Sequence, residues 1–367
     1  MAPWHDARMS RIAAVAPALP PYAYAQEEIT AVLAPLVVPD AASPRRAVLE
    51  RVHANTGVST RHLAVPLERY RDLTSFDQTN DLFLSVGLDL AEQAVRDALK
   101  LAGLVPEDVD HILFTSVTGI SAPSLDALLA PRLGMRPDVR RVPIFGLGCV
   151  AGAAGIARVH DYLVGHPDDV AVLLSVELCS LTLQHGDDSM ANLVSSGLFG
   201  DGAAAVVMLG AERAARTGAV GPDVLGSASR LYPDTDGMLG WDVGGSGFRI
   251  VLSASLSDVV ERNLGDDVTA LLDAHGLTPG DVGTWVAHTG GPRVLEACAR
   301  TLGLERRDLE LSWRSLDRVG NLSSSSVLHV LADTLAAGTV PPGDLGVLFA
   351  MGPGICAELV LLRWPED

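Results

Sequence analysis

A cysteine set among glycines is the residue of this chain best suited to nucleophilic chemistry. Cys149 follows Gly148 and opens a run of small residues that continues to Gly155. The apolar residues 142–144 before it indicate the end of a buried strand, and the spacing over 152–162 predicts a helix. A thiol at a helix N-terminus feels the positive end of the helix dipole, which favours the thiolate. Free cysteine is also among the most buried residue types, so an inert core thiol is the alternative interpretation.

Two later segments carry the polar residues that such a nucleophile needs. His288 ends an apolar run and precedes two glycines and Pro292, a residue favoured at the first position of a helix. Asn321 follows Gly320 and precedes four serines, which are good caps for the helix predicted after them. Each segment alone is typical of a turn. A Cys, a His and an Asn that each stand at the end of a predicted strand or the start of a predicted helix together indicate one catalytic site.

Alternating strands and helices are expected to position these residues. Both halves of the chain repeat the order helix, strand, glycine loop and helix, which indicates an internal duplication with domains 1–220, carrying the cysteine, and 221–367, carrying the histidine and asparagine. The Asp- and Gly-rich segment 232–247 predicts a loop between them. Continuous apolar runs predict strands buried on both faces, and 3.6-residue periodicity predicts helices. The strands are expected over 109–116, 169–178, 203–209, 282–288, 346–350 and 356–364, and the helices over 89–101 and 254–274.

Composition narrows the class of protein. The chain has 367 residues, 48% of them hydrophobic, which is enough for a large core, and a net charge of −18. Nucleic-acid partners require basic patches, so this acidic balance argues against them. No basic start with a long apolar run and no stretch of 18 apolar residues occurs, so we expect a cytoplasmic protein without membrane insertion. The other cysteines form no C-x-x-C pair and are expected in the core; they are Cys179, Cys298 and Cys356.

Several motifs together resemble one known family, the type III polyketide synthases of the chalcone and stilbene synthase superfamily. The resemblance runs from about Arg11 to Leu362. Thr289 departs from it, standing where the family usually has proline, and Met351 departs from the family's Gly-Phe-Gly-Pro-Gly loop. The motifs are Gly148-Cys149, Leu198-Phe199-Gly200-Asp201-Gly202-Ala203-Ala204, His288-Thr289-Gly290-Gly291-Pro292, Gly320-Asn321-Leu322-Ser323-Ser324 and Met351-Gly352-Pro353-Gly354.

The resemblance implies a fold and a mechanism. The fold is an α/β, thiolase-like fold of duplicated αβαβα layers with mixed sheets, in a homodimer. Cys149 attacks an acyl-coenzyme A thioester and carries the acyl chain, and His288 stabilises the thiolate as imidazolium. Asn321 donates to the enolate oxygen formed when malonyl-coenzyme A loses carbon dioxide. The expected partners are coenzyme A thioesters, with no metal, no nicotinamide cofactor and no carrier protein.

The resemblance also assigns residues to a substrate cavity. Phe199 and Phe248 match two gatekeepers between tunnel and cavity, and Ile250 shares a strand face with Phe248. Thr182 matches only through a one-residue gap. Arg61, in a basic run with Arg45, Arg46, Arg51 and His62, is expected at the mouth of the coenzyme A tunnel. The remaining cavity residues are Val117, Trp241, Ser323, Gly352, Pro353 and Gly354.

The sequence leaves several substrate classes open. The segment 174–202 looks most like the bacterial branch that makes alkylresorcinols and alkylpyrones from fatty acyl starters, and each buried methylene favours a long chain by ~0.8 kcal/mol. Tetrahydroxynaphthalene-type synthases, which use malonyl-coenzyme A as starter, are the nearest alternative. A ketoacyl synthase III-like initiator of fatty acid synthesis would use a carrier protein instead. A non-catalytic thiolase-fold scaffold would lack the cysteine or the asparagine.

Overall fold

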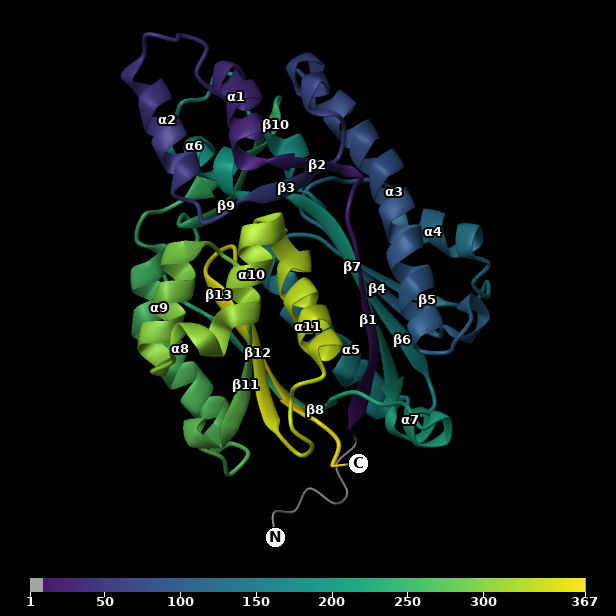
Figure 1. Ribbon diagram of the computed structural model, residues 1–367. Coiled ribbons are helices and arrows are strands. Elements are labelled where there is room, and N and C mark those ends of the chain that lie inside the picture. Colours follow the sequence, from purple (N-terminus) through teal and green to yellow (C-terminus); the bar gives the residue numbers. More distant parts are fainter. Residues whose placement is uncertain (1–8, 367) are drawn as a thin grey trace.

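The computed structural model describes residues 9–366 and is built around one nine-stranded mixed sheet (Figure 1). From edge to edge the strands are β11 (Val282–Ala287), β12 (Leu345–Gly352), β13 (Cys356–Arg363), β8 (Asp223–Leu231), β1 (Ser10–Ala18), β7 (Asp201–Gly210), β6 (Val170–Leu178), β4 (His111–Thr115) and β5 (Arg140–Ile144). β1 joins the two halves, because it pairs antiparallel with β7 on one side and with β8 on the other. β12 and β13 pair antiparallel, as the sequence predicts.

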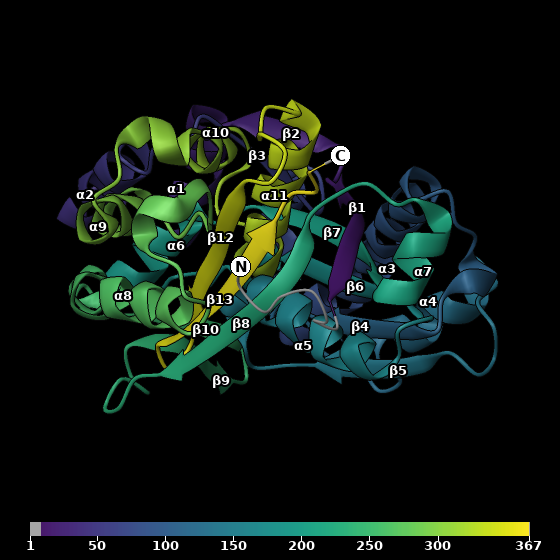
Figure 2. The same ribbon diagram turned by 90° about the horizontal axis from the view of Figure 1, so that it is seen from below.

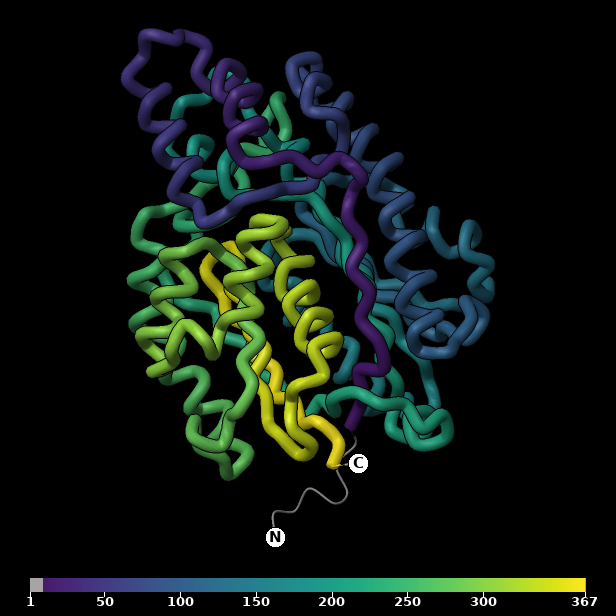
Figure 3. The backbone as a smooth tube through the Cα atoms, viewed as in Figure 1, coloured from purple at the N-terminus to yellow at the C-terminus, as the bar shows by residue number. Residues whose placement is uncertain are grey.

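The helices form three layers around this sheet (Figures 1 and 2). α3 (Phe76–Leu101) and α4 (Leu125–Leu133) cover the outer face of one half, and α8 (Leu256–Asp273) and α9 (Pro292–Leu302) cover the outer face of the other. α5 (Ala151–Gly165) and α11 (Ser326–Ala337) lie between the halves, and Figure 3 shows α11 beside β1 from the opposite end of the chain. This is the duplicated thiolase-like arrangement that the sequence predicts. The remaining helices are α1 (Gln26–Val37), α2 (Pro44–Ala54), α6 (Met190–Leu198), α7 (Ala211–Thr217) and α10 (Glu310–Val319).

The strands at the centre are apolar on both faces because helices cover both. In β7, Ala203, Ala205 and Val207 belong to the core under α3. Ala204 and Val206, which alternate with them, belong to the core around α5 and α11. Successive side chains of a strand point to opposite faces, so a strand between two helical layers has no polar face. Within residues 9–366, no helix is long and apolar enough to cross a lipid bilayer.

Two small hairpins depart from the main sheet, and one corrects the sequence analysis. β2 (Tyr22–Ala25) pairs with β3 (Thr60–Leu63). β9 (Leu239–Gly244) pairs antiparallel with β10 (Gly247–Leu252), so the segment predicted as a loop over 232–247 contains a strand. The two-residue connection Gly245-Ser246 suits a tight hairpin turn. The high content of Asp and Gly reflects this turn and the exposed end of the hairpin.

The strand before Cys149 is a second correction. The sequence analysis expects a buried strand end at 142–144, whereas β5 is the edge of the sheet and most of its residues are exposed. Val142 is 42% exposed, Phe145 is 50% exposed and Ile120, after β4, is 52% exposed. Exposed apolar side chains at the edge of a sheet favour packing with another chain.

We therefore expect the protein to be a homodimer in solution, with a second copy covering the face around β5. Light scattering at micromolar concentration should give twice the chain mass, and Val142→Asp should shift the equilibrium toward monomer because a charge disfavours burial. Val220→Asp, at an apolar residue that is 81% exposed before β8, is the matched control and should leave the mass unchanged. A monomeric wild-type protein would contradict this expectation.

Candidate active site

Cys149 lies in a short 3-10 turn, η4 (Gly148–Val150), directly before α5. Gly148 has φ +57°, a left-handed conformation that glycine adopts without a Cβ clash. The Sγ atom of Cys149 lies 3.6 Å from Oγ of Ser323. Burial raises the pKa of the Cys149 thiol to about 12, outweighing the Ser323 contact. The sequence analysis expects a helix dipole to favour the thiolate, but desolvation is the larger effect on the pKa of Cys149.

Asn321 is fixed by the backbone on both of its sides. Its N–H donates to the carbonyl of Leu198 at 2.9 Å, and its carbonyl accepts from the N–H of Gly200 at 3.0 Å. Its side-chain Oδ1 accepts from the N–H of Ser323 at 2.8 Å and from Oγ of Ser326 at 3.3 Å. Because the amide oxygen is engaged in this way, the two N–H donors of the amide remain for a substrate oxygen.

Ser323 connects the nucleophile to the asparagine. It contacts Cys149 through its hydroxyl and Asn321 through its backbone N–H. Its φ is +50°, a left-handed conformation that a residue with a Cβ rarely adopts. Strain of this kind, held by surrounding contacts, is typical of functional sites.

His288 follows the last residue of β11 and is anchored to the neighbouring strand. Its N–H donates to the carbonyl of Phe349 in β12 at 3.0 Å. Its Nδ1 atom is buried without a hydrogen-bond partner among the described residues. Burial lowers the pKa of His288 to about 4. A buried ring nitrogen that lacks a partner is suited to a substrate oxygen or an acidic proton, because either one would satisfy it.

The pKa shifts of Cys149 and His288 both arise from burial, which penalises each isolated charge. The family resemblance assigns His288 to Cys149 as its partner, although His288 does not line the cavity that contains Cys149. A thiolate and an imidazolium formed side by side would stabilise one another, which would favour proton transfer between them over loss of a proton to water. Between a pKa of about 4 for His288 and about 12 for Cys149, the number of protons on the pair does not change with pH.

We therefore expect alkylation of Cys149 by iodoacetamide to be nearly independent of pH, changing less than about threefold between pH 6 and 9. In His288→Ala the thiol must lose its proton to water, and the rate should rise roughly tenfold per pH unit over the same range. Intact-protein mass spectrometry measures both rates. A wild-type rate that follows the slope of His288→Ala would show that His288 does not take the proton.

The cavity above Cys149 brings together residues from most of the chain. It has a volume of about 30 Å³. Val117, Phe199, Trp241, Ile250, Ser323 and Pro353, all assigned to the cavity from sequence, lie on its wall. The complete lining is Val117, Gly148, Cys149, Cys179, Phe199, Leu239, Gly240, Trp241, Ile250, Ser323 and Pro353.

Phe248, Gly352 and Gly354 were also assigned to the cavity from the sequence, but they lie behind its wall and do not line it. The ring of Phe248 packs edge-on against Phe76 at a centroid distance of 5.2 Å and lies 6.0 Å from the rings of Trp241 and Phe145. Gly352 leaves room for η4, because a Cβ there would approach the carbonyl oxygen of Leu147 to 2.5 Å. Gly354 does not line the cavity and turns the chain into β13 with φ +63°.

Cys179 lines this cavity and Thr182 does not, which corrects the sequence assignment of Thr182. Cys179 is also 6% exposed, as expected for a core residue. Both belong to the 3-10 turn η5 (Cys179–Thr182) after β6. Cys179 lines the cavity, whereas the hydroxyl of Thr182 donates back to the carbonyl of Cys179 at 2.8 Å and lies away from it. The sequence analysis placed Cys179 in the core because it ends an apolar run. The one-residue gap needed to align Thr182 was the signal that its position was insecure.

Arg61 does not belong to a surface patch. It is 2% exposed, and its Nη1 donates to the carbonyl of Phe199 at 2.7 Å while Nε donates to Oε1 of Gln26 at 3.0 Å. Burial lowers the pKa of Arg61 to about 10, so it stays a cation at neutral pH. Arg61 thus holds the Phe199 segment, which pairs with Asn321. Its burial removes it from the mouth of a coenzyme A tunnel.

Three other residues of this basic run, Arg45, Arg46 and His62, each bind a different backbone carbonyl. Arg45 donates to the carbonyl of Asp188 at 3.0 Å, and Arg46 donates to the carbonyl of Val38. His62 bonds the carbonyl of Pro20 at 2.6 Å. Arg51, on the exposed side of α2, is the residue of this run that stays accessible for an anionic ligand.

Glu177 is a buried carboxylate beneath the cavity that the sequence analysis did not single out. It accepts from the N–H of Val117 at 3.1 Å, from Oγ1 of Thr118 at 2.9 Å and from the hydroxyl of Ser324. Burial raises its pKa. Its hydrogen bonds connect the segment that contains Val117 to the segment that contains Ser323 and Ser324. A charged residue inside the otherwise apolar strand 170–178 was the signal that could have identified it.

Comparison with known proteins agrees with this site. The family model for chalcone and stilbene synthases matches with its N-terminal domain over residues 5–213 and with its C-terminal domain over residues 223–364. A 1,3,6,8-tetrahydroxynaphthalene synthase of Streptomyces peucetius subsp. caesius is 57% identical over 97% of this chain and 94% of its own length. A putative chalcone synthase of Bacillus subtilis is 34% identical over 85% of this chain and 87% of its own.

A solved structure extends the agreement to the fold. The crystal structure of 1,3,6,8-tetrahydroxynaphthalene synthase from Streptomyces coelicolor A3(2) superposes with a TM-score of 0.90, at 31% identity, over 98% of this chain and all of that one. These matches cover both halves of the sheet and every residue of the site. The chain therefore belongs to the chalcone and stilbene synthase family and is a type III polyketide synthase, an enzyme that joins acyl units by decarboxylating condensation.

Proposed function

We propose that this enzyme makes a tetrahydroxynaphthalene from malonyl-coenzyme A alone, using it both as starter and as extender. The observation that carries the proposal is the 57% identity to a 1,3,6,8-tetrahydroxynaphthalene synthase over nearly the whole chain. Relatives of the same name from Streptomyces griseus and Streptomyces coelicolor are 34% and 33% identical. This favours the reading kept as an alternative above over the alkylresorcinol and alkylpyrone reading.

The cavity wall also suits a small starter. Trp241 and Phe199 line the cavity, and Phe248 with its neighbours Phe76 and Phe145 forms an aromatic cluster behind Trp241. A fatty acyl tail would need an apolar channel through this cluster. A malonyl starter needs no such channel, and flat aromatic walls suit a chain that ends as fused rings.

Each residue of the site has its own role in loading, decarboxylation and condensation. The Cys149 thiolate attacks the malonyl thioester, coenzyme A leaves as its thiol, and the starter is held as a new thioester. A second malonyl-coenzyme A loses carbon dioxide, and the electron pair of the broken bond forms an enolate whose oxygen accepts from Asn321 and His288. The enolate carbon attacks the Cys149 thioester, a carbon–carbon bond forms, and the Cys149 thiolate is released for the next transfer.

The product itself tests this proposal. Purified enzyme given malonyl-coenzyme A alone should yield a ten-carbon tetrahydroxynaphthalene, identified by liquid chromatography and mass spectrometry. Addition of a medium or long acyl-coenzyme A should leave this product dominant. Product that appears only with an acyl-coenzyme A, and that carries its alkyl chain, would restore the fatty acyl reading.

Ile250 is expected to limit how far the chain grows. It lines the cavity and pairs across the hairpin with Trp241. Ile250→Trp adds an aromatic ring to a filled wall, and overpacking typically costs ~1–3 kcal/mol, which is roughly fivefold to over a hundredfold in rate. We expect the ten-carbon product to fall by at least that lower factor while shorter pyrones increase.

Val251→Trp is the matched control for this expectation. Val251 is the next residue of β10, so its side chain points to the opposite face from that of Ile250. The ratio of shorter to full-length products should change in Ile250→Trp and not in Val251→Trp. Equal ratios in wild type and Ile250→Trp would show that Ile250 does not border the growing chain.

A further inference from the structure

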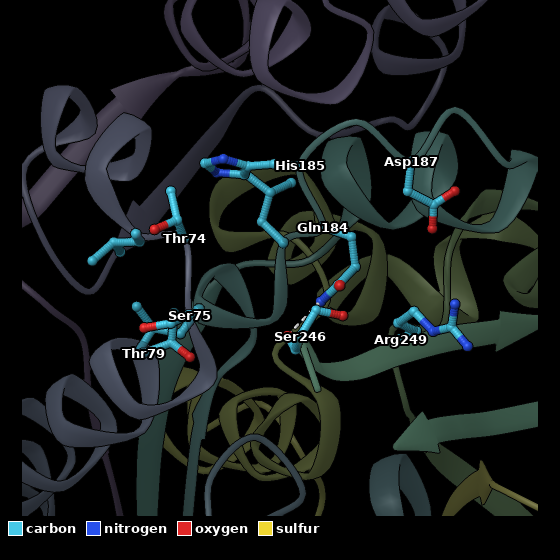
Figure 4. A pocket seen from close by; sticks show the side chains of 11 residues that line it. Thr74, Ser75, Thr79, Gln184, His185, Asp187, Ser246 and Arg249 are labelled. Carbon is cyan, nitrogen blue, oxygen red and sulfur yellow. Dashed lines mark hydrogen bonds between the residues drawn. The ribbon is translucent and has the colours of Figure 1, made fainter. Parts of the chain in front are cut away.

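A second pocket, larger than the catalytic cavity, lies beside it without sharing a lining residue. Its volume is about 350 Å³, within the usual range for small-molecule sites. It is formed by the start of α3, the segment between η5 and α6, and β10 with its turn (Figure 4). Its lining residues are Leu73, Thr74, Ser75, Thr79, Leu181, Leu183, Gln184, His185, Asp187, Ser246 and Arg249.

Gln184 offers a hydrogen-bond acceptor to this pocket. It is 6% exposed, and its Nε2 donates to the carbonyls of Thr182 at 3.0 Å, Ser246 at 3.3 Å and Phe248 at 3.3 Å. Figure 4 shows the contact with Ser246. Because the amide nitrogen is fully used, the amide oxygen is the group that remains for a ligand.

The other polar groups also favour a ligand that donates hydrogen bonds. Asp187 accepts from the N–H of Ser189 at 2.9 Å through one carboxylate oxygen, which leaves the second. His185 is exposed, and desolvation lowers its pKa, so its ring is neutral and has an acceptor nitrogen. Arg249 forms an ion pair with Asp242, so its charge is already compensated and does not favour an anion.

The apolar part of the wall suits a flat ring. Leu73, Leu181 and Leu183 line the pocket together with the hydroxyls of Thr74 and Thr79. Leucine side chains and hydrogen-bond acceptors side by side match an aromatic ring that carries several hydroxyl groups. A sugar would make no apolar contact with the leucine side chains, and a fatty chain would leave the acceptors without hydrogen-bond donors.

This pocket is mechanically tied to the catalytic wall. In β10, Arg249 lines the pocket and Ile250, the next residue, lines the catalytic cavity. In η5, Leu181 lines the pocket and Cys179 the cavity. Gln184 holds the carbonyl of Phe248, and Phe76, next to Ser75, packs on the Phe248 ring. A ligand in the pocket would therefore hold β10 in place, whereas the catalytic cavity of about 30 Å³, with Ile250 of β10 in its wall, must enlarge to hold a growing chain.

We propose that this pocket binds a polyhydroxylated aromatic of the class that the enzyme itself makes, and that binding there slows chain extension. The identity of the ligand as a product rests on the proposed function. The chemistry of the pocket does not depend on it. A ligand in the pocket would hold β10 in the position it has here, against the catalytic cavity. Inhibition should therefore persist however much substrate is present.

Binding is tested first on enzyme in which iodoacetamide has alkylated Cys149, so that the catalytic cavity is filled and turnover is absent. The probe is 1,3-dihydroxynaphthalene, measured by isothermal titration calorimetry. The comparison probe is 1,3-dimethoxynaphthalene, which has the same rings without hydrogen-bond donors. We expect the dihydroxy probe to bind at least tenfold more tightly than the dimethoxy probe. Equal affinities, or no binding of either, would overturn the proposal.

Inhibition is then tested on active enzyme. The dihydroxy probe should lower kcat without being overcome by excess malonyl-coenzyme A. Ser246→Trp, in the exposed turn of the hairpin, fills the mouth of the pocket and should weaken inhibition by the probe at least tenfold. Val243→Trp, exposed on β9 of the same hairpin and outside both linings, is the control. Inhibition that malonyl-coenzyme A overcomes, and that Ser246→Trp leaves unchanged, would place the probe in the catalytic cavity.

The binding experiment separates this proposal from the proposed function, because alkylated enzyme makes no product. An enzyme that makes tetrahydroxynaphthalene but does not bind the probe leaves the function standing and removes the regulatory site. An enzyme that binds the probe but makes another product keeps the site and loses the assignment of its natural ligand.

Discussion

Cys149→Ala is expected to abolish polyketide formation while leaving decarboxylation of malonyl-coenzyme A measurable. Without the thiol no acyl chain can be held, so product should fall by more than roughly a thousandfold. Decarboxylation needs only the donors that stabilise the enolate. Asn321 is held by hydrogen bonds with Leu198, Gly200, Ser326 and the backbone N–H of Ser323, and Cys149 takes part in none of these bonds.

The measurement follows two products of malonyl-coenzyme A in parallel, acetyl-coenzyme A and polyketide, by mass spectrometry. Cys298→Ala is the control, because Cys298 is buried in the core around α9 and does not line the cavity. It should retain both activities unless the protein unfolds, which circular dichroism would detect. Polyketide formation by Cys149→Ala at a tenth of the wild-type rate or more would disprove the role of the nucleophile.

The fold was largely predictable from the sequence because apolar runs mark strands that are covered on both faces. The segment 203–209 has no polar residue, and the structure places it in β7 between two helical layers. The same rule fails at β5, since the apolar Val142 and Ile144 belong to a strand on the edge of the sheet. Sequence alone does not distinguish a face covered by a helix from one left for a second copy of the chain.

The positions of Cys149, His288 and Asn321 in the fold were also predictable, because each stands where a strand or helix begins or ends; their catalytic roles stay a prediction. The supporting residues were not. Glu177, Arg61 and Cys179 acquire their places through contacts between segments far apart in the chain, such as Arg61 with Phe199. A basic residue near other basic residues was interpreted as a surface patch, whereas burial beside a backbone carbonyl defines what Arg61 does.

Substrate choice is the least predictable property because it depends on volumes rather than on residue types. The match of 174–202 to enzymes with fatty acyl starters favoured a long chain, yet a relative that is 57% identical is a tetrahydroxynaphthalene synthase, as are two relatives at 34% and 33% identity. Trp241 and Phe248 lie 6.0 Å apart across this wall. Whether such rings leave a channel depends on their packing against Phe76 and Phe145, which comes from α3 and the loop before Cys149.

Asn321→Asp should produce the reverse of the Cys149→Ala result, with loading intact and decarboxylation lost. Aspartate keeps the oxygen that accepts from Ser323 and Ser326, so the strained turn at Ser323 keeps its support. It replaces the two N–H donors by a second oxygen, which repels an enolate. Loss of one such donor typically costs 10²–10³-fold in kcat, and we expect decarboxylation to fall by at least ~10²-fold.

Intact-protein mass spectrometry distinguishes the two steps in this variant, since Cys149 should accumulate a malonyl group that it cannot extend. Ser326→Ala is the matched control, because it removes a partner of the Asn321 oxygen and leaves both N–H donors in place. A net hydrogen bond contributes ~1 kcal/mol, so this control should lose less than about tenfold. If Asn321→Asp decarboxylates within threefold of wild type, the enolate oxygen must be held elsewhere. His288, the second donor that the mechanism assigns to this oxygen, would then be the residue to test next.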